Sequence, residues 1–173
     1  MILNINLLEK ERKEPNISKE SIEFISKLCQ IIKPKNILEI GCFNGYSALW
    51  LSLYSKNVIS LEIDEENIKL AKKNFQRAKC ENIEIIVGDA KETLKKLNSK
   101  FQIILIDGKK SEYKTYLELS LKLLDKNGLI FADNTISHKD KLKDFYYYYL
   151  EKNNLYYKEL NLGKGLMIIS KKP

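Results

Sequence analysis

Three oxygen-bearing side chains follow two apolar segments in the second half of the chain. Asp107 ends the segment 101–106, and Asp133 and Asn134 follow the segment 129–132. If the two segments are adjacent strands, ~4.8 Å apart, these side chains converge at one edge of a sheet. Two carboxylates and an amide oxygen, with no His or Cys in the motif, favour a hard divalent cation such as Mg²⁺ or Ca²⁺. The alternative is that Asp and Asn at strand ends only stabilise turns.

A second candidate site is the turn 39–47, which reads EIGCFNGYS. Gly41 and Gly45 allow a ligand to approach the backbone closely. Their Gly-x-x-x-Gly spacing departs from the dinucleotide-binding fingerprint, and no Gly-Lys-Ser/Thr follows for a phosphate loop. Glu62 lies 21 residues after Gly41, where a carboxylate accepts hydrogen bonds from both ribose hydroxyls. An adenosine without phosphates, near carboxylates such as Glu39, suits a cationic sulfonium cofactor. A plain strand-turn-helix with a solvated Glu62 is the alternative.

The elements that must position these groups alternate between short apolar strands and helical segments. This order is typical of βαβ units with a parallel sheet covered on both faces. We predict an α/β fold with a doubly wound, mostly parallel, seven-stranded sheet that ends in an antiparallel hairpin around Gly163-Lys164-Gly165. The predicted strands are 36–40, 58–63, 83–87, 101–106, 129–132, 155–160 and 166–170. The predicted helices are one capped by Ser18, then 45–54, 65–78, a short one after Asp89, 111–124 and a lysine-rich one after the fifth strand.

Composition limits the class of protein. The 173 residues are 44% hydrophobic and carry 7 Gly and 3 Pro, which suits one globular domain, a core over 18–173 with a short extension over 1–17. Three cysteines without a CxxC pair indicate neither a disulfide framework nor a zinc site. No apolar run reaches the ~20 residues of a membrane span, and no signal-peptide pattern is present. We therefore expect a cytoplasmic protein without a membrane partner.

Most of the net charge of +7 lies in the last third of the chain, where residues 109–173 hold 13 basic and 8 acidic side chains. Nearly all of the positive charge is lysine rather than arginine, the residue that nucleic-acid sites often use for base recognition. A solvated surface and a polyanionic partner both remain open on this evidence.

The motifs together resemble a known family. ILEIGCFNGYSALWLS (37–52) is similar to the first motif of class I S-adenosylmethionine methyltransferases. Its Gly-x-x-x-Gly-Tyr-Ser pattern (41–47) resembles the cation-dependent O-methyltransferases of the catechol and caffeoyl-CoA type. The resemblance continues in order through LEID (61–64), IVGDAKETL (86–94), LIDGKKSEY (105–113), LLDKNGLIFADN (123–134) and GKGLMIISKK (163–172). It implies the Rossmann-like methyltransferase fold, with S-adenosylmethionine as cofactor.

Position by position, the resemblance implies a role for each matched residue. Lys110 would be the general base, since a nearby cation favours loss of the proton of a desolvated ammonium, and Asp107 would share the catalytic role. The divalent cation, Mg²⁺ with Ca²⁺ or Mn²⁺ as alternatives, would lie on Asp107, Asp133 and Asn134. The cofactor would contact Glu39, Gly41, Phe43, Gly45, Tyr46, Ser47, Glu62, Ile63, Asp89, Ala90 and Asp107.

The sequence departs from the family pattern at several places. Lys109 replaces an acidic or aromatic residue, which leaves open which of the two lysines acts. The N-terminal helices are shortened to about 1–15 and the loop 135–139 is short, so we expect an open acceptor pocket. The lone His138 is a surface residue, or else a base or an accessory metal ligand. The run Tyr146–Tyr149 would pack on a partner subunit or stack on bases.

The resulting hypothesis is metal-assisted O-methylation of a hydroxyl on a small molecule, in a homodimer. Two alternatives stay open. One is an RNA methyltransferase on the same fold, acting on a tRNA hydroxyl through the lysine-rich last third. The other is a non-catalytic S-adenosylmethionine-binding domain. A nicotinamide-dependent enzyme is disfavoured by the glycine spacing.

Overall fold

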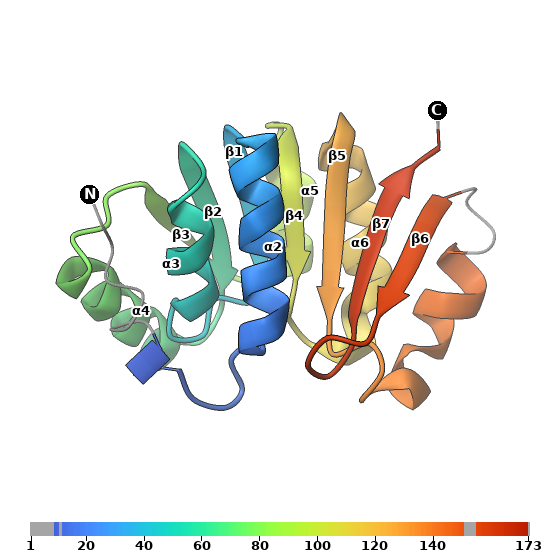
Figure 1. Ribbon diagram of the computed structural model, residues 1–173, viewed down its shortest axis with the longest axis horizontal. Helices are drawn as coiled ribbons and strands as arrows, with labels where there is room; N and C mark the ends of the chain where they lie inside the picture. Colours follow the sequence, from blue (N-terminus) through green and yellow to red (C-terminus); the bar gives the residue numbers. More distant parts are fainter. Residues whose placement is uncertain (1–8, 11, 151–154, 173) are drawn as a thin grey trace.

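One seven-stranded sheet organises the chain. The computed structural model describes residues 9–10, 12–150 and 155–172, with the backbone alone for 147–149. The strand order is β3-β2-β1-β4-β5-β7-β6. β1 to β5 pair in parallel, and β7 runs antiparallel to both β5 and β6 (Figure 1). This confirms the predicted doubly wound sheet with an antiparallel C-terminal hairpin.

The bounds of the elements follow the predicted pattern. The strands are β1 Asn36–Ile40, β2 Asn57–Glu62, β3 Ile83–Val87, β4 Phe101–Ile106, β5 Leu124–Asp133, β6 Leu155–Leu160 and β7 Leu166–Lys171. The helices are α2 Lys19–Ile32, α3 Tyr46–Ser52, α4 Glu65–Arg77, α5 Ala90–Lys96 and α6 Tyr113–Leu123. Two short 3-10 helices, Lys110–Glu112 and Lys139–Leu142, and a π-helix, Asp144–Leu150, complete the described part.

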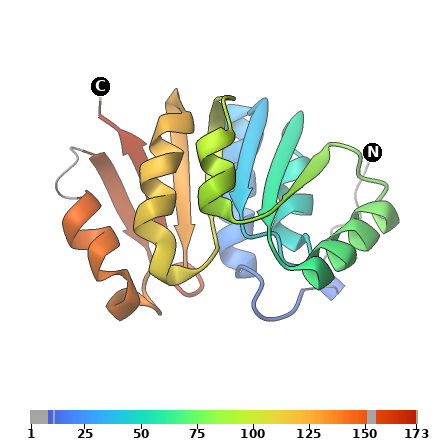
Figure 2. The same cartoon turned by 180° about the vertical axis from the view of Figure 1, so that it is seen from behind.

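Helices cover both faces of the sheet and create two separate cores. α2, α3 and α4 pack their buried side chains against one face, where the cluster includes Ile22, Leu49 and Phe75. α5, α6 and the π-helix cover the other face, where it includes Leu94 and Leu117. Figures 1 and 2 show the two layers from opposite sides. The central strands are buried on both faces, which explains their continuous apolar sequences.

Side-chain caps fix where three helices begin. The Ser18 hydroxyl accepts from the backbone N–H of Ser21 at 3.1 Å and begins α2, as predicted. Asp64 and Asp89 cap α4 and α5 in the same way, each through a carboxylate oxygen. A polar side chain that satisfies these free N–H groups stabilises a helix start by about 0.5–2 kcal/mol. The caps of α4 and α5 come directly after the sheet, so they also fix the loops that follow β2 and β3.

Several predicted boundaries and one predicted helix type differ from the structure. β5 begins at Leu124 and not at 129, because 125–128 continue as a polar strand that a search for apolar runs cannot detect. The helix predicted over 111–124 begins at Tyr113, since the preceding 3-10 turn ends only at Glu112. The predicted lysine-rich helix after the fifth strand is a 3-10 helix and a π-helix.

The topology brings distant segments to the edge at which β1 to β5 end. Because β7 is antiparallel to β5, the β6–β7 turn lies at this edge as well (Figure 1). The segment 12–17 passes the same edge before α2 begins. In the described residues, no helix combines the length and the apolar character needed to cross a membrane.

The turn before α3 depends on a glycine at position 45. Gly45 has a φ of 81°, and a Cβ there would lie 2.3 Å from the ring of Phe75. We expect Gly45→Ala to lower the free energy of unfolding by about 1–3 kcal/mol through strain and overlap. Chemical denaturation measures this loss. In a Phe75→Ala background the loss should shrink, because the overlap is gone; an equal loss in both backgrounds would contradict the steric explanation.

Candidate active site

A cleft opens at the carboxyl edge of the sheet. Its volume is about 710 Å³, and its walls come from the loops after β1 to β5, from the segment 14–17 and from the β6–β7 turn. Ligands of doubly wound sheets bind at this edge, outside the strand ends. The predicted site residues that line the cleft are Gly41, Phe43, Ser47, Glu62, Ile63, Asp89, Ala90, Asp107, Lys110 and Asn134.

The glycine turn approaches the neighbouring loop more closely than a side chain allows. Gly41 has a φ of 100°, and a Cβ on it would lie 2.4 Å from the carbonyl oxygen of Asp107. Phe43 also has a positive φ, 47°, and its N–H donates to Glu62 Oε2 at 2.8 Å. The loops after β1, β2 and β4 are therefore in direct contact around one corner of the cleft.

Glu62 is oriented by the backbone around it. Its Oε1 accepts from the N–H groups of Ile63 and Asp64 at 2.8 and 3.0 Å, in addition to the bond between Oε2 and Phe43. Three backbone donors fix the carboxylate in one orientation on the cleft wall. Each carboxylate oxygen retains acceptor capacity, which suits a pair of adjacent hydroxyl groups.

Glu39 supports the turn from below rather than lining the cleft. It is fully buried, and the Ser60 hydroxyl donates to its Oε2. The other oxygen has no hydrogen-bond partner among the described residues. Burial raises the pKa of Glu39 to about 8, although the nearby Ser47 and Ser60 hydroxyls act in the opposite direction. At neutral pH this carboxyl is mostly protonated, so it does not present the negative charge that the sequence suggested.

Two further predicted cofactor residues lie behind the cleft wall. Gly45 and Tyr46 are absent from the cleft lining. The Tyr46 ring is buried, and its hydroxyl donates to Glu9 Oε1 at 2.7 Å. Tyr46 is the first residue of α3 and faces the core side of that helix, so its side chain anchors the segment before α2 and points away from the cleft.

The cleft wall also contains residues that the sequence did not single out. Tyr116 and Glu112 line it beside Ala90, with the Tyr116 hydroxyl donating to Glu112 Oε2 at 2.7 Å. Lys91 Nζ lies 3.0 Å from Glu112 Oε1. The sequence could have indicated these residues by their position, because they lie at the start of the helical region that follows β4. The first turn of that region faces the cleft.

The predicted metal ligands do gather at the other end of the cleft. Asp107 and Asn134 line it, and Asp133 is buried beside them, with no side-chain donor to its carboxylate among the described residues. Burial raises the pKa of both aspartates. The charge of Asp107 raises the pKa of Asp133 further, and the Lys110 ammonium opposes the shift at both. A buried carboxylate without donors is costly unless a cation or a proton compensates it. The donor set therefore fits a divalent cation.

The donor set is nonetheless small. Within the described ranges, no group of three or more His, Cys, Asp and Glu side chains is arranged to hold a metal ion. A cation between Asp107 and Asp133 would take its third protein ligand from the Asn134 amide, and the rest from water or from a bound molecule.

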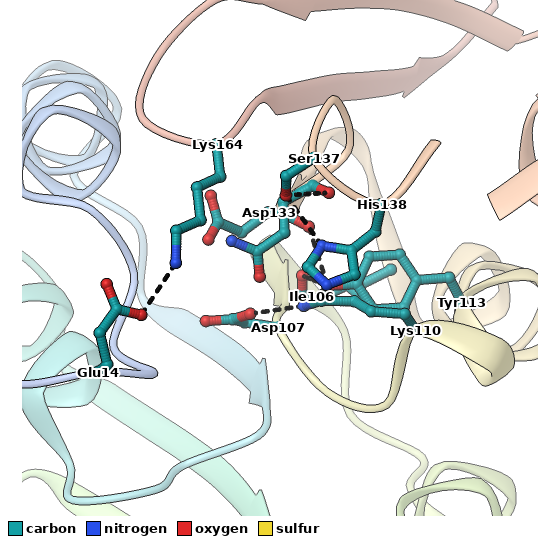
Figure 3. A network of polar contacts seen from close by, with 10 residues as sticks. Glu14, Ile106, Asp107, Lys110, Tyr113, Asp133, Ser137, His138 and Lys164 are labelled. Carbon is teal, nitrogen blue, oxygen red and sulfur yellow. Dashed lines mark hydrogen bonds and ion pairs between the residues drawn. The ribbon is translucent and has the colours of Figure 1, made fainter. Parts of the chain in front are cut away.

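The two adjacent lysines point to different partners. Lys110 is mostly buried, and its Nζ donates to Asp107 Oδ1 at 2.9 Å (Figure 3). The Lys109 side chain is 71% exposed, with its Nζ 3.4 Å from Glu112 Oε1. Lys110 is thus the lysine that pairs with Asp107, whereas Lys109 pairs with Glu112.

The remaining wall is built from two loops that bond to each other. The carbonyl of Lys164, in the β6–β7 turn, accepts from the N–H groups of Ile136 and Ser137, and that of Gly165 accepts from Thr135. The Lys164 ammonium lies 2.9 Å from Glu14 across the cleft (Figure 3). His138 also lines the cleft, with its Nδ1 2.9 Å from the Ser137 hydroxyl.

This geometry agrees with comparisons against known proteins. A profile of a family described as O-methyltransferase matches residues 4–151. The chain belongs to the O-methyltransferase family. It is 35% identical over 129 residues to a catechol O-methyltransferase of Niastella koreensis, a match that covers 70% of this chain and 58% of that protein. It is 31% identical over 128 residues to "Probable caffeoyl-CoA O-methyltransferase 2" of Dictyostelium discoideum, covering 69% and 55%.

The fold of this O-methyltransferase family member is also that of solved methyltransferases. The SAH-bound methyltransferase PaMTH1 of Podospora anserina matches with a TM-score of 0.88 and 24% identity, over 98% of this chain and 87% of that one. The matched segments span a little over half the length of the curated relatives. The predicted family and the Rossmann-like fold are thereby confirmed.

The raised pKa of Glu39 makes a prediction about stability. The unfolded chain loses this proton near the ordinary pKa of 4.5, whereas the folded protein keeps it until about pH 8. Between these values the unfolded state binds fewer protons, so stability falls as pH rises, by up to about 1.4 kcal/mol per pH unit. Glu39→Gln removes this contribution. The difference in unfolding free energy between the two proteins should change with that slope from pH 5 to 7.5; a constant difference would contradict the assignment.

Proposed function

We propose that this chain is an S-adenosylmethionine-dependent O-methyltransferase that methylates a hydroxyl of a small molecule with the help of a divalent cation. The observation that carries the proposal is the division of one cleft into two ends. One end presents the Glu62 carboxylate and the glycine turn, and the other presents Lys110 beside the partly exposed Asp107 and the buried Asp133. The first end suits a nucleoside and the second suits the activation of a hydroxyl.

The residues at the first end would hold the methyl donor. Glu62 would accept hydrogen bonds from the two ribose hydroxyls. Ile63 and Ala90 would flank the adenine, and Asp89 would lie at its edge. Gly41, Phe43 and Ser47 would surround the methionine part. The fold neighbour PaMTH1 is described as SAH-bound, which agrees with a donor of this class in the present cleft.

Asp107, Asp133 and Asn134 would hold the divalent cation. When bound, Mg²⁺ or a similar ion supplies positive charge that favours the ionised form of a nearby hydroxyl. The buried Asp133 carboxyl supports this assignment, because it lacks a side-chain donor in the described residues and a cation would favour its ionised form.

Lys110 would remove the proton of the acceptor, acting as a neutral amine. In the reaction, the acceptor O–H bond breaks and the proton moves to the lone pair of Lys110 Nζ. The oxygen then forms a bond to the methyl carbon as the carbon–sulfur bond breaks, which leaves a methyl ether and S-adenosylhomocysteine. Because both ends of one cleft hold their reactants, much of the rate would come from positioning.

RNA methylation remains the second candidate, on the basis of the lysine excess in 109–173. Label transfer separates the candidates: methyl-labelled S-adenosylmethionine, Mg²⁺ and a whole-cell extract are incubated with and without chelator. We expect chelator-sensitive label in small molecules. Label in RNA, with binding that weakens steeply as salt rises, would favour the RNA methyltransferase. Cofactor binding without label in any fraction would contradict both and favour a non-catalytic domain.

The proposed base gives a separate prediction. Lys110→Met should lower kcat by about 10²–10⁴-fold, because the proton of the acceptor loses its receiver. The affinity for S-adenosylmethionine, measured by calorimetry, should stay within about 2-fold, since Lys110 contacts the acceptor end. Lys126→Met is the matched control: Lys126 is exposed in β5, outside the cleft lining. Equal turnover by both variants would remove Lys110 from the mechanism.

A further inference from the structure

The hydroxyl of Tyr113 contacts three groups at the acceptor end of the cleft. Tyr113 is the first residue of α6, and its side chain is fully buried. Its oxygen lies 2.6 Å from Lys110 Nζ, 3.0 Å from the carbonyl oxygen of Asp133 and 3.2 Å from that of Ile106 (Figure 3).

Chemistry fixes the direction of these hydrogen bonds. A phenol has one proton, and a carbonyl oxygen can only accept. The Tyr113 proton is therefore shared between the carbonyls of Ile106 and Asp133, and the lone pairs of the hydroxyl face Lys110. Lys110 must donate one N–H to Tyr113, and it donates a second to Asp107 Oδ1 at 2.9 Å. Two of the three positions around its nitrogen are thus assigned.

The third position on Lys110 Nζ faces the cleft. Across the described part of the chain, Lys110 has no further hydrogen-bond acceptor, and it lines the cleft. When Lys110 is neutral, both remaining N–H groups can be donated to Tyr113 and Asp107. Its lone pair then occupies the third position, where the proton of an acceptor hydroxyl would arrive.

The Tyr113 ring is held in place by its neighbours. The Phe145 ring packs edge-on at 5.9 Å between centroids, and Tyr116 packs at 6.4 Å. Burial, together with the charges of Asp107 and Asp133, raises the pKa of Tyr113 well above its usual value. Tyr113 therefore stays a neutral hydroxyl, and it is not itself a base.

We propose that Tyr113 is a positioning residue. It holds the amine of Lys110 so that the lone pair of Lys110 Nζ points at the acceptor hydroxyl. The inference rests on the proposed function, because it assigns a purpose to the orientation of the proposed base. The same hydroxyl joins the ends of β4 and β5, so it also fixes the spacing of the strands that carry Asp107 and Asp133.

The first test needs no acceptor. In wild-type protein labelled with ¹⁵N-lysine, we expect the Nζ protons of Lys110, identified by their absence in Lys110→Arg, to exchange with water at least about tenfold more slowly than those of Lys109. Tyr113→Phe keeps the ring and should remove most of this protection. Exchange of Lys110 as fast as that of Lys109 in the wild type would overturn the proposal without any substitution.

The second test is kinetic. With catechol as a probe acceptor and saturating Mg²⁺, Tyr113→Phe should lower kcat by about 10–100-fold at nearly unchanged KM. Tyr146→Phe is the matched control, because it also deletes a phenol bonded to a backbone carbonyl, that of Thr135, outside the cleft lining. It should keep both the exchange protection of Lys110 and kcat.

The outcomes separate this inference from the proposed function. If Lys110→Met abolishes turnover and Tyr113→Phe does not lower kcat, the positioning role is wrong and the base remains. If Lys110→Met leaves turnover intact, the proposed base is wrong, whatever the exchange rates show. Equal losses of kcat in Tyr113→Phe and Tyr146→Phe would indicate a general effect on stability and would also overturn the positioning role.

Discussion

The contact between Gly41 and the carbonyl of Asp107 is the constraint on which the cleft depends. β1 and β4 are neighbours at the centre of the sheet, and their loops meet where a Cβ on Gly41 would lie 2.4 Å from the Asp107 oxygen. The β1 loop carries the proposed methionine contacts, and the β4 loop carries Asp107 and Lys110. Because Gly41 has no side chain, the end of the cleft proposed for the methyl donor and the end proposed for the methyl acceptor meet at this contact.

Buried carboxyl groups are concentrated around this boundary. Glu39, Asp107 and Asp133 are all shielded from water, and burial raises the pKa of each. Burying such groups lowers the free energy of unfolding, which is only about 5–15 kcal/mol for a globular protein. Two of them are compensated in part, Glu39 by the Ser60 hydroxyl and Asp107 by Lys110. Asp133 lacks a side-chain donor in the described residues, so it is the group that a cation at the proposed site would stabilise most.

The sequence was sufficient for the features that follow from strand order. Asp107 and Asn134 converge because adjacent parallel strands end at the same edge, and Glu62 lies on the cleft because it ends β2. Features set by long-range packing could not be obtained in this way. The inward rotation of Tyr46 at the start of α3 is one example, and the bond between its hydroxyl and Glu9 another. Lys164 was recognisable only as part of a turn, although an antiparallel strand beside β5 must turn at the edge where β5 ends.

The backbone bonds between the loop after β5 and the β6–β7 turn have a consequence for protein engineering. Residues 135–137 donate three N–H groups to the carbonyls of Lys164 and Gly165, so the two loops form one wall. The strand ends that carry Asp107 and Asp133 are independent of the length of either loop. Loop exchange aimed at a new acceptor specificity should therefore transplant both loops together. The loop after β5 alone would lack the carbonyls that accept its N–H groups, and the β6–β7 turn alone would lack those N–H donors.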